Sequence, residues 1–418
     1  MTLAANAPSA GRDAAGIGAA SAAGTAVNVL KLVLFASLFT ASDLDLLTAG
    51  LLLAITGAQL CGEPLANFAV IRDDRPSARW VVLVLPLAFA LTAAFPRAVL
   101  AAVAPGVDAT PHAMEIMRFF SLAGASLVLL WWAAGEAQRR LDFLGFQSLF
   151  LVPNLATVIA VCLPVDDRVA AVPVGLAVGC AAAAAYVAAR TRRFPAAGTG
   201  RTPAKGSGRT IAALVALAVA AVANLVLLRV VGSLLPQGSL GVLYLSASVL
   251  IIPTSAIGGA LGASLLPRWA APSDEQGLSH PATAAWFSAG LTAACAAVLV
   301  GAFFVAREIP AVQDGVDPTI LTGLATALPI MAAGAALHGA GPVARSYAVA
   351  HGRIGLMIAL ACAGAALVPV AYLVSPTLAG LSVGYALSAL PWLAAIPLIR
   401  AGNPRSALEP LPNAGQGL

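Results

Sequence analysis

Three charged side chains, Lys31, Glu63 and Arg229, lie inside long apolar runs of this sequence. A charge at the centre of a bilayer costs about 2.5–3.5 kcal/mol on insertion scales unless it is paired or hydrated, so such residues often mark a substrate pathway. Two of the three are cations. The chemistry they predict is the binding of an anionic group within the membrane.

Lys31 lies about nine residues from the outer end of its run, or about 14 Å at 1.5 Å per residue, which is near the midplane. We expect its ammonium group to face a cavity and contact an anionic group of the substrate. Snorkelling or a structural ion pair would also explain it. Glu63 is either a counter-charge or a carboxylate for cation coupling, and its depth differs from that of Lys31 by about 10 Å. Arg229, one turn from the outer end of its run, is either a second anion contact or an interfacial cation.

Two asparagines occupy equivalent positions of an internal repeat. At an offset of 196 residues, segment 28–65 aligns without gaps on segment 224–261, and Asn28 is matched by Asn224. Both side chains are candidates for hydrogen bonds to the substrate. Hydrogen bonds between helices would explain them nearly as well.

The composition requires a membrane setting for these residues. The chain has 418 residues, of which 60% are hydrophobic and only 10% charged. An ordinary soluble domain has about 25% charged residues, and the mean hydropathy here is +0.91. A soluble enzyme and a nucleic-acid-binding protein are excluded on this basis.

Apolar runs bounded by charge, proline or glycine predict an all-α polytopic protein with about twelve transmembrane helices. The first six runs are 17–40, 46–71, 79–104, 114–135, 143–164 and 168–190, and the second six are 210–232, 238–267, 282–306, 318–346, 353–374 and 376–399. With both termini cytoplasmic, seventeen Lys and Arg residues fall in inner segments and only Arg97, Arg168 and Arg307 in outer ones. This asymmetry follows the positive-inside rule.

The longest polar stretch divides the chain into two halves. Residues 191–209, rich in Pro, Gly and basic side chains, predict a cytoplasmic linker between six-helix bundles at 17–190 and 210–400. Tails at 1–16 and 401–418 are predicted to be cytoplasmic. An even number of spans per half gives both repeats one orientation, so a substrate cavity is expected between two parallel bundles.

No sequence motif for catalysis is found. There is no acid/base dyad, nucleophile elbow, Walker motif or metal-ligand spacing, and the five scattered cysteines are typical of small buried hydrophobes. We therefore expect a non-enzyme without cofactor or metal, in contact with membrane lipids. Its protein partners cannot be predicted.

Several segments, in this order and spacing, resemble the MurJ/MviN flippases of the multidrug/oligosaccharidyl-lipid/polysaccharide (MOP) exporter superfamily. They are Asp43 and Asp45 after the first run, Gly62-Glu63 followed by Asn67-Phe68-Ala69, Phe150-Leu-Val-Pro-Asn154, the stretch GSLGVLYLSASVLIIPTSAIGGALGASLLPRW from Gly238, and Pro342-Val-Ala-Arg-Ser-Tyr-Ala348. The resemblance covers most of the chain.

The resemblance implies a MATE-like pair of six-helix bundles that moves a lipid-linked saccharide pyrophosphate across the bacterial inner membrane by alternating access. Flippases for lipid II usually carry cavity arginines, whereas this chain has Ala58-Gln59-Leu60 and Ala247-Ser248 at the corresponding places. Two alternatives stay open. One is a cation- or proton-coupled exporter of amphipathic small molecules, and the other is a non-transporting membrane scaffold derived from a flippase.

Overall fold

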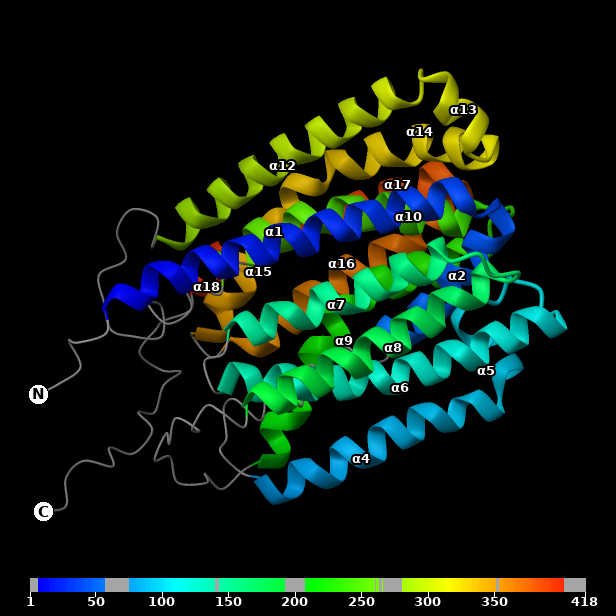
Figure 1. The fold of residues 1–418 in the computed structure, drawn as a ribbon. Coiled ribbons are helices and arrows are strands. Elements are labelled where there is room, and N and C mark those ends of the chain that lie inside the picture. Colours follow the sequence, from blue (N-terminus) through cyan, green and yellow to red (C-terminus); the bar gives the residue numbers. More distant parts are fainter. Residues whose placement is uncertain are drawn as a thin grey trace, which may run out of the picture. The chain divides into compact units, whose positions relative to one another are not determined.

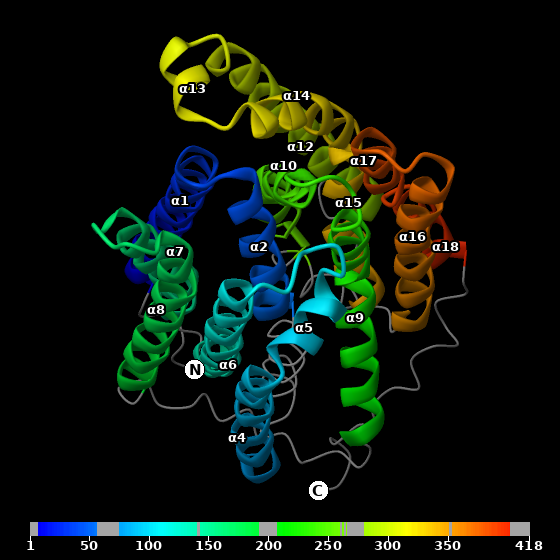
Figure 2. The ribbon, with the colours of Figure 1, turned by 90° about the vertical axis from the view of Figure 1, so that its right-hand side faces the viewer.

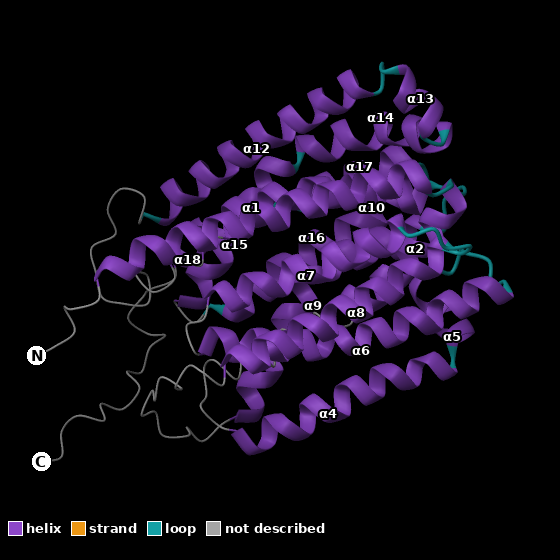
Figure 3. Cartoon of the chain, viewed as in Figure 1, coloured by secondary structure: helices purple, strands orange, loops and turns teal. Residues whose placement is uncertain are grey.

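The computed structural model describes residues 7–56, 75–139, 143–191, 207–259, 261–262, 265, 280–350 and 353–401. Almost all of these residues are helical, and no strand occurs among them (Figure 3). The predicted all-α class is confirmed. Glu63 and the linker at 191–209, apart from Thr191 and residues 207–209, lie outside the described residues.

The chain divides into two compact units. Unit 1 comprises residues 1–219, 229–242 and 314–320, and unit 2 comprises residues 220–228, 243–313 and 321–418. Helix α9 (Ser207–Gly232) contributes residues to both units. The predicted boundary at 191–209 stays a prediction.

Unit 1 is built on α1 (Ala7–Leu38), α2 (Ala41–Leu51), α4 (Arg75–Leu91), α5 (Pro96–Val103), α6 (Pro111–Arg139), α7 (Phe143–Cys162) and α8 (Arg168–Thr191). Helix α8 packs along α7 and α6, and α1 packs along α7, as both views show (Figures 1 and 2). The helices α7 and α8 approach closely because α8 has glycines where they meet. A Cβ at Gly179 would lie 2.6 Å from the Cα of Pro153, so only glycine fits there.

Unit 2 is built mainly on α10 (Ser239–Pro253), α12 (Pro281–Ala306), α13 (Pro310–Gly315), α14 (Pro318–Ala333), α15 (Ala335–Ala350), α16 (Ile354–Val374), α17 (Leu378–Leu387) and α18 (Pro391–Ala401). Helices α12 and α15 pack closely, again at a glycine. A Cβ on Gly339 would lie 2.5 Å from Thr292 Oγ1 and 3.1 Å from the Ser288 carbonyl oxygen.

Both units contain one π-helical turn, and the two turns lie in spans that the repeat aligns. One turn, η1 (Leu52–Thr56), follows α2, and the other, η3 (Thr254–Gly259), follows α10 directly after Pro253. Proline has no N–H to continue the helical hydrogen bonds, and π turns often mark functional sites. A π-helical turn thus occurs in both of the aligned spans, and the repeat itself stays a prediction.

The described helices include five that are long and apolar enough to cross a membrane, or up to seven if each bent pair is one span. One bent pair is segment 83–94, which ends in the short 3-10 helix η2 (Thr92–Ala94), followed by α5, with a bend of 99°. The other is α14 followed by α15, with a bend of 49°. Large apolar side chains such as Val298, Leu373 and Val374 are 70–82% exposed, as lipid-facing residues are. The count of twelve spans stays a prediction.

Candidate functional site

Lys31 lies on the face of α1 that packs against α7. Its side chain is 8% exposed, and its neighbours Leu32 and Phe35 on the same helix are also buried. The Lys31 Nζ atom donates a hydrogen bond to Asn154 Oδ1 at 2.6 Å. Asn154 follows Pro153 in α7, and so the family-like Pro-Asn pair provides the partner of the lysine.

The positive charge of Lys31 is not neutralised by any described residue. An ammonium group has three donors, and the amide oxygen of Asn154 is its only partner within the described part of the chain. A neutral acceptor satisfies one N–H but does not compensate a buried charge. The pair Lys31–Asn154 therefore forms a cationic site in unit 1 that an anion would stabilise.

Asn28 lies three residues before Lys31 on α1 and is half-buried. Residues three apart share a helix face, so the amide and the ammonium group are neighbours. The Asn28 side chain makes no hydrogen bond to the described residues. An amide next to a cation adds both a donor and an acceptor for a bound polar group.

The remaining predicted residues are distributed over the chain. Arg229, in the last turn of α9, is buried at 7% exposure and interacts with other groups in the protein. Asn224 belongs to unit 2, where its Nδ2 atom donates to Ser388 Oγ over 3.4 Å. A joint role of Lys31, Arg229, Asn224 and the undescribed Glu63 stays a prediction, as does each role in cargo binding.

Asp45 has a role that sequence reasoning missed. It is a buried carboxylate, 8% exposed, near the start of α2. Its Oδ2 atom accepts the N–H of Gly238 at 2.6 Å, and its Oδ1 atom accepts the N–H of Gly241 at 2.7 Å. Gly238 has φ +90°, which favours glycine. The side chain thus joins the start of α2 to the start of α10 within unit 1. The only sequence signal was an acidic residue just after the first span.

A second carboxylate makes contacts at the same segment of α2. Asp317 Oδ2 accepts the N–H of Ala41 at 3.1 Å, while Oδ1 accepts the N–H of Thr319 at 2.8 Å. Desolvation raises the pKa of Asp317, but the hydrogen bonds from Thr319, Ala41 and Ile320 outweigh it and lower the pKa below 3.8. Its folded form therefore favours the charged carboxylate.

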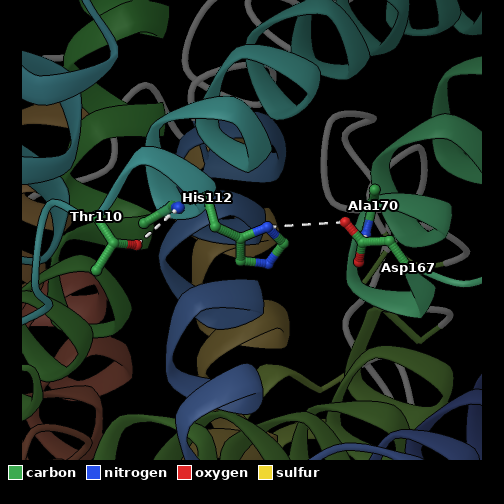
Figure 4. Close-up of polar contacts among 5 residues, drawn as sticks. Thr110, His112, Asp167 and Ala170 are labelled. Atoms are coloured by element: carbon green, nitrogen blue, oxygen red, sulfur yellow. Dashed lines mark hydrogen bonds and ion pairs between the residues drawn. The ribbon is translucent and has the colours of Figure 1, made fainter.

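A cavity of about 700 Å³ in unit 1 is lined by three carboxylates, of Asp43, Asp166 and Asp167, and also by His112 and Arg168. His112 Nδ1 lies 3.8 Å from Asp167 Oδ2, an ion pair when the histidine is protonated (Figure 4). Asp167 Oδ1 also accepts the N–H of Ala170 at 3.0 Å. Among the described residues no group of three His, Cys, Asp or Glu could hold a metal ion. Three carboxylates against one guanidinium give the lining a net negative charge, which disfavours an anionic group such as a pyrophosphate.

Comparison by sequence found no match, either among protein-family models or among curated proteins. Solved structures do match. The lipid II flippase MurJ in an inward closed conformation superposes with a TM-score of 0.71 at 12% identity, covering 92% of this chain and 87% of that one. An inward-facing multidrug resistance MATE transporter of the MOP superfamily has the same TM-score and identity, with coverage of 90% and 94%.

A third structure, a MOP superfamily transporter from Pyrococcus furiosus described as having a binding pocket of reverse polarity, matches with a TM-score of 0.55 at 14% identity over 94% of this chain and 90% of that one. Identities this low establish the fold alone. Together with the apolar helices they indicate a multi-pass membrane protein. The chain has the fold that MurJ and the MATE transporters of the MOP superfamily share.

Proposed function

We propose that this protein moves a lipid-linked saccharide across the bacterial plasma membrane by alternating access, with both termini in the cytoplasm. The fold supports a transporter, because its neighbours are a flippase and exporters. The cationic pair Lys31–Asn154 favours a cargo with a buried anionic group. A polyprenyl-pyrophosphate-linked saccharide combines such a group with a lipid tail that stays in the bilayer.

The observation that carries this proposal is the charge of Lys31, which no described residue compensates. A diphosphate oxygen is a stronger acceptor for an ammonium group than a neutral amide, since both partners are then charged. Asn154 Oδ1 accepts one hydrogen bond from Lys31 Nζ, and the cargo would accept those that no described residue accepts. Asn28, on the same face of α1, would hydrogen-bond the pyrophosphate or the first sugar.

Alternating access requires contacts that hold one state and break in the other. Asp45 provides such contacts, because both of its short hydrogen bonds join segments that are far apart in the sequence. The π-helical turn η3 after Pro253 offers a place where the helix bends. In the proposed cycle, opening towards the outside breaks the Asp45 hydrogen bonds, and cargo on Lys31 shifts the population towards that state.

A second candidate function is the export of amphipathic small molecules, which the equal TM-score of the MATE transporter favours. Such exporters need no anionic group on their cargo. A buried ammonium with no carboxylate partner among the described residues disfavours cationic cargo, so the two functions differ in the charge of the molecule that is moved.

The two functions are distinguished in proteoliposomes. Three fluorescent probes are incorporated into separate samples: a lipid-linked saccharide with a pyrophosphate, a neutral glycolipid and an amphipathic cationic dye. The accessibility of each probe to an external quencher reports its movement across the membrane. Our proposal expects movement of the pyrophosphate lipid alone. Movement of the dye alone would establish the exporter, and movement of none would favour the non-transporting scaffold.

A further inference from the structure

Unit 2 encloses a cavity of about 170 Å³ that the proposed cargo site does not include. Residues of α9, α10, η3, α15, α16, α17 and α18 line it, together with Ser388 between α17 and α18. The polar lining residues are Asn224, Thr254, His338, Arg345, Tyr385, Ser388 and Trp392. Drug-sized ligands occupy about 300–1,000 Å³, while a water takes about 30 Å³. The volume therefore fits one small group of a few heavy atoms.

Arg345 gives this cavity its charge. It is half-buried on α15, and no described residue forms an ion pair or hydrogen bond with it. None of the lining residues is acidic. A guanidinium group presents five N–H donors in a planar fork, which suits an oxyanion that accepts two of them at once.

Two further donors line the same cavity. The indole N–H of Trp392 makes no hydrogen bond to the described residues, although an indole nitrogen can only donate. Among the described residues, Asn224 Nδ2 has only the 3.4 Å hydrogen bond to Ser388 Oγ, and Asn224 Oδ1 accepts the N–H of Leu225 at 2.9 Å. The amide donor is therefore available for a better acceptor, and none of the lining residues supplies an anionic acceptor for these donors.

Another part of the lining is fixed by contacts of its own. The ring of His338 stacks on that of Tyr385, with centroids 4.5 Å apart and planes 20° apart. His338 Nε2 lies 3.1 Å from the Tyr385 carbonyl oxygen, which needs the tautomer with its proton on Nε2. A wall held in this way is preorganised, which lowers the entropic cost of binding a ligand.

We propose that this cavity binds one phosphate group on Arg345, Trp392 and Asn224. The group is either free inorganic phosphate or the headgroup of a phosphomonoester lipid such as phosphatidic acid. Both sources present the same tetrahedral oxyanion. The residues of this site belong to unit 2, whereas Lys31, on which the proposed cargo binds, belongs to unit 1.

The test measures binding to the full chain in an uncharged detergent by titration calorimetry. One arm uses inorganic phosphate with chloride at the same ionic strength as a control, and the other uses mixed micelles of phosphatidic acid against phosphatidylcholine. We expect saturable binding of phosphate, of phosphatidic acid or of both. Arg345→Gln should weaken this binding at least tenfold. Trp392→Phe, which keeps an aromatic ring but removes the indole N–H, should weaken it severalfold.

The matched control is Arg353→Gln, an arginine at the start of α16 that does not line the cavity, and it should bind like the unaltered protein. Thermal midpoints without ligand verify that each variant is folded. Binding of neither probe, equal binding of chloride, or unchanged binding by the folded Arg345→Gln variant would overturn the proposal. Since no transport is measured, these outcomes do not depend on whether the protein moves a lipid-linked saccharide.

Discussion

Replacing Asp45 by Asn tests the contact that joins the starts of α2 and α10. The substitution keeps the size of the side chain but turns one acceptor oxygen into an NH₂ group. One of the two backbone N–H groups, of Gly238 or Gly241, then faces a donor instead of a carboxylate oxygen now 2.6–2.7 Å away. The variant is therefore expected to lose one hydrogen bond and weaken the other.

The magnitude follows from the geometry. Hydrogen bonds to charged groups contribute about 1.5–3 kcal/mol each, and a buried N–H left without a partner costs about 1–3 kcal/mol. Since Asp45 is 8% exposed, water does not replace the lost acceptor. We expect a loss of about 2–4 kcal/mol, which for a unit of this size corresponds to a lower thermal midpoint by about 4–8 °C.

The assay is thermal unfolding in detergent, with Asp43→Asn as the matched control. Asp43 is two residues away on the same helix and forms a partly exposed capping box with Thr40, so the same chemical change should cost less than about 1 kcal/mol. Equal midpoints for the two variants would refute the reasoning, because they would show that the Asp45 hydrogen bonds contribute no more than an exposed cap.

Two further predictions concern stability. Because the pKa of Asp317 is lowered in the folded protein, the stabilisation by its carboxylate is complete at pH values above the ordinary pKa of 3.8 and is lost as the pH falls through the folded pKa. The difference in thermal midpoint between the unaltered protein and Asp317→Asn should thus be constant at higher pH and shrink below about pH 4. A difference independent of pH would contradict this prediction. Gly339→Ala should destabilise by about 1–3 kcal/mol, because its Cβ would meet Thr292 Oγ1 at 2.5 Å, whereas Gly290→Ala, with nothing within 4 Å, should be neutral or stabilising in the same unfolding assay.

The sequence was most informative where physical constraints are simple. Apolar length predicted the helices, and the described boundaries of α8 and α16 lie within two residues of the expected runs. Close packing at glycine became evident only in the structure: a Cβ at Gly258 would lie 2.7 Å from the Gly339 carbonyl oxygen. Breaks within spans, such as the 99° bend before α5, depend on tertiary packing and were not predicted.

Partners of buried polar groups were harder to predict. The rarity of charge within apolar runs singled out Lys31, but its partner Asn154 is 123 residues away and depends on how α1 packs against α7. The role of Asp45 depends in the same way on Gly238, 193 residues away. Arg345 was noted only as part of a motif, since a cavity formed by several helices is not visible in the sequence.

The most direct test of the proposed function is transport of a pyrophosphate-linked saccharide by Lys31→Met and Lys31→Arg in proteoliposomes, with their thermal midpoints measured in parallel. Methionine removes the charge, whose burial is costly. The free energy of unfolding of this variant should therefore stay within about 2 kcal/mol of that of the unaltered protein or rise. We expect this folded variant to lose transport and Lys31→Arg to retain part of it. Normal transport by Lys31→Met would contradict the claim that the Lys31 ammonium binds the cargo.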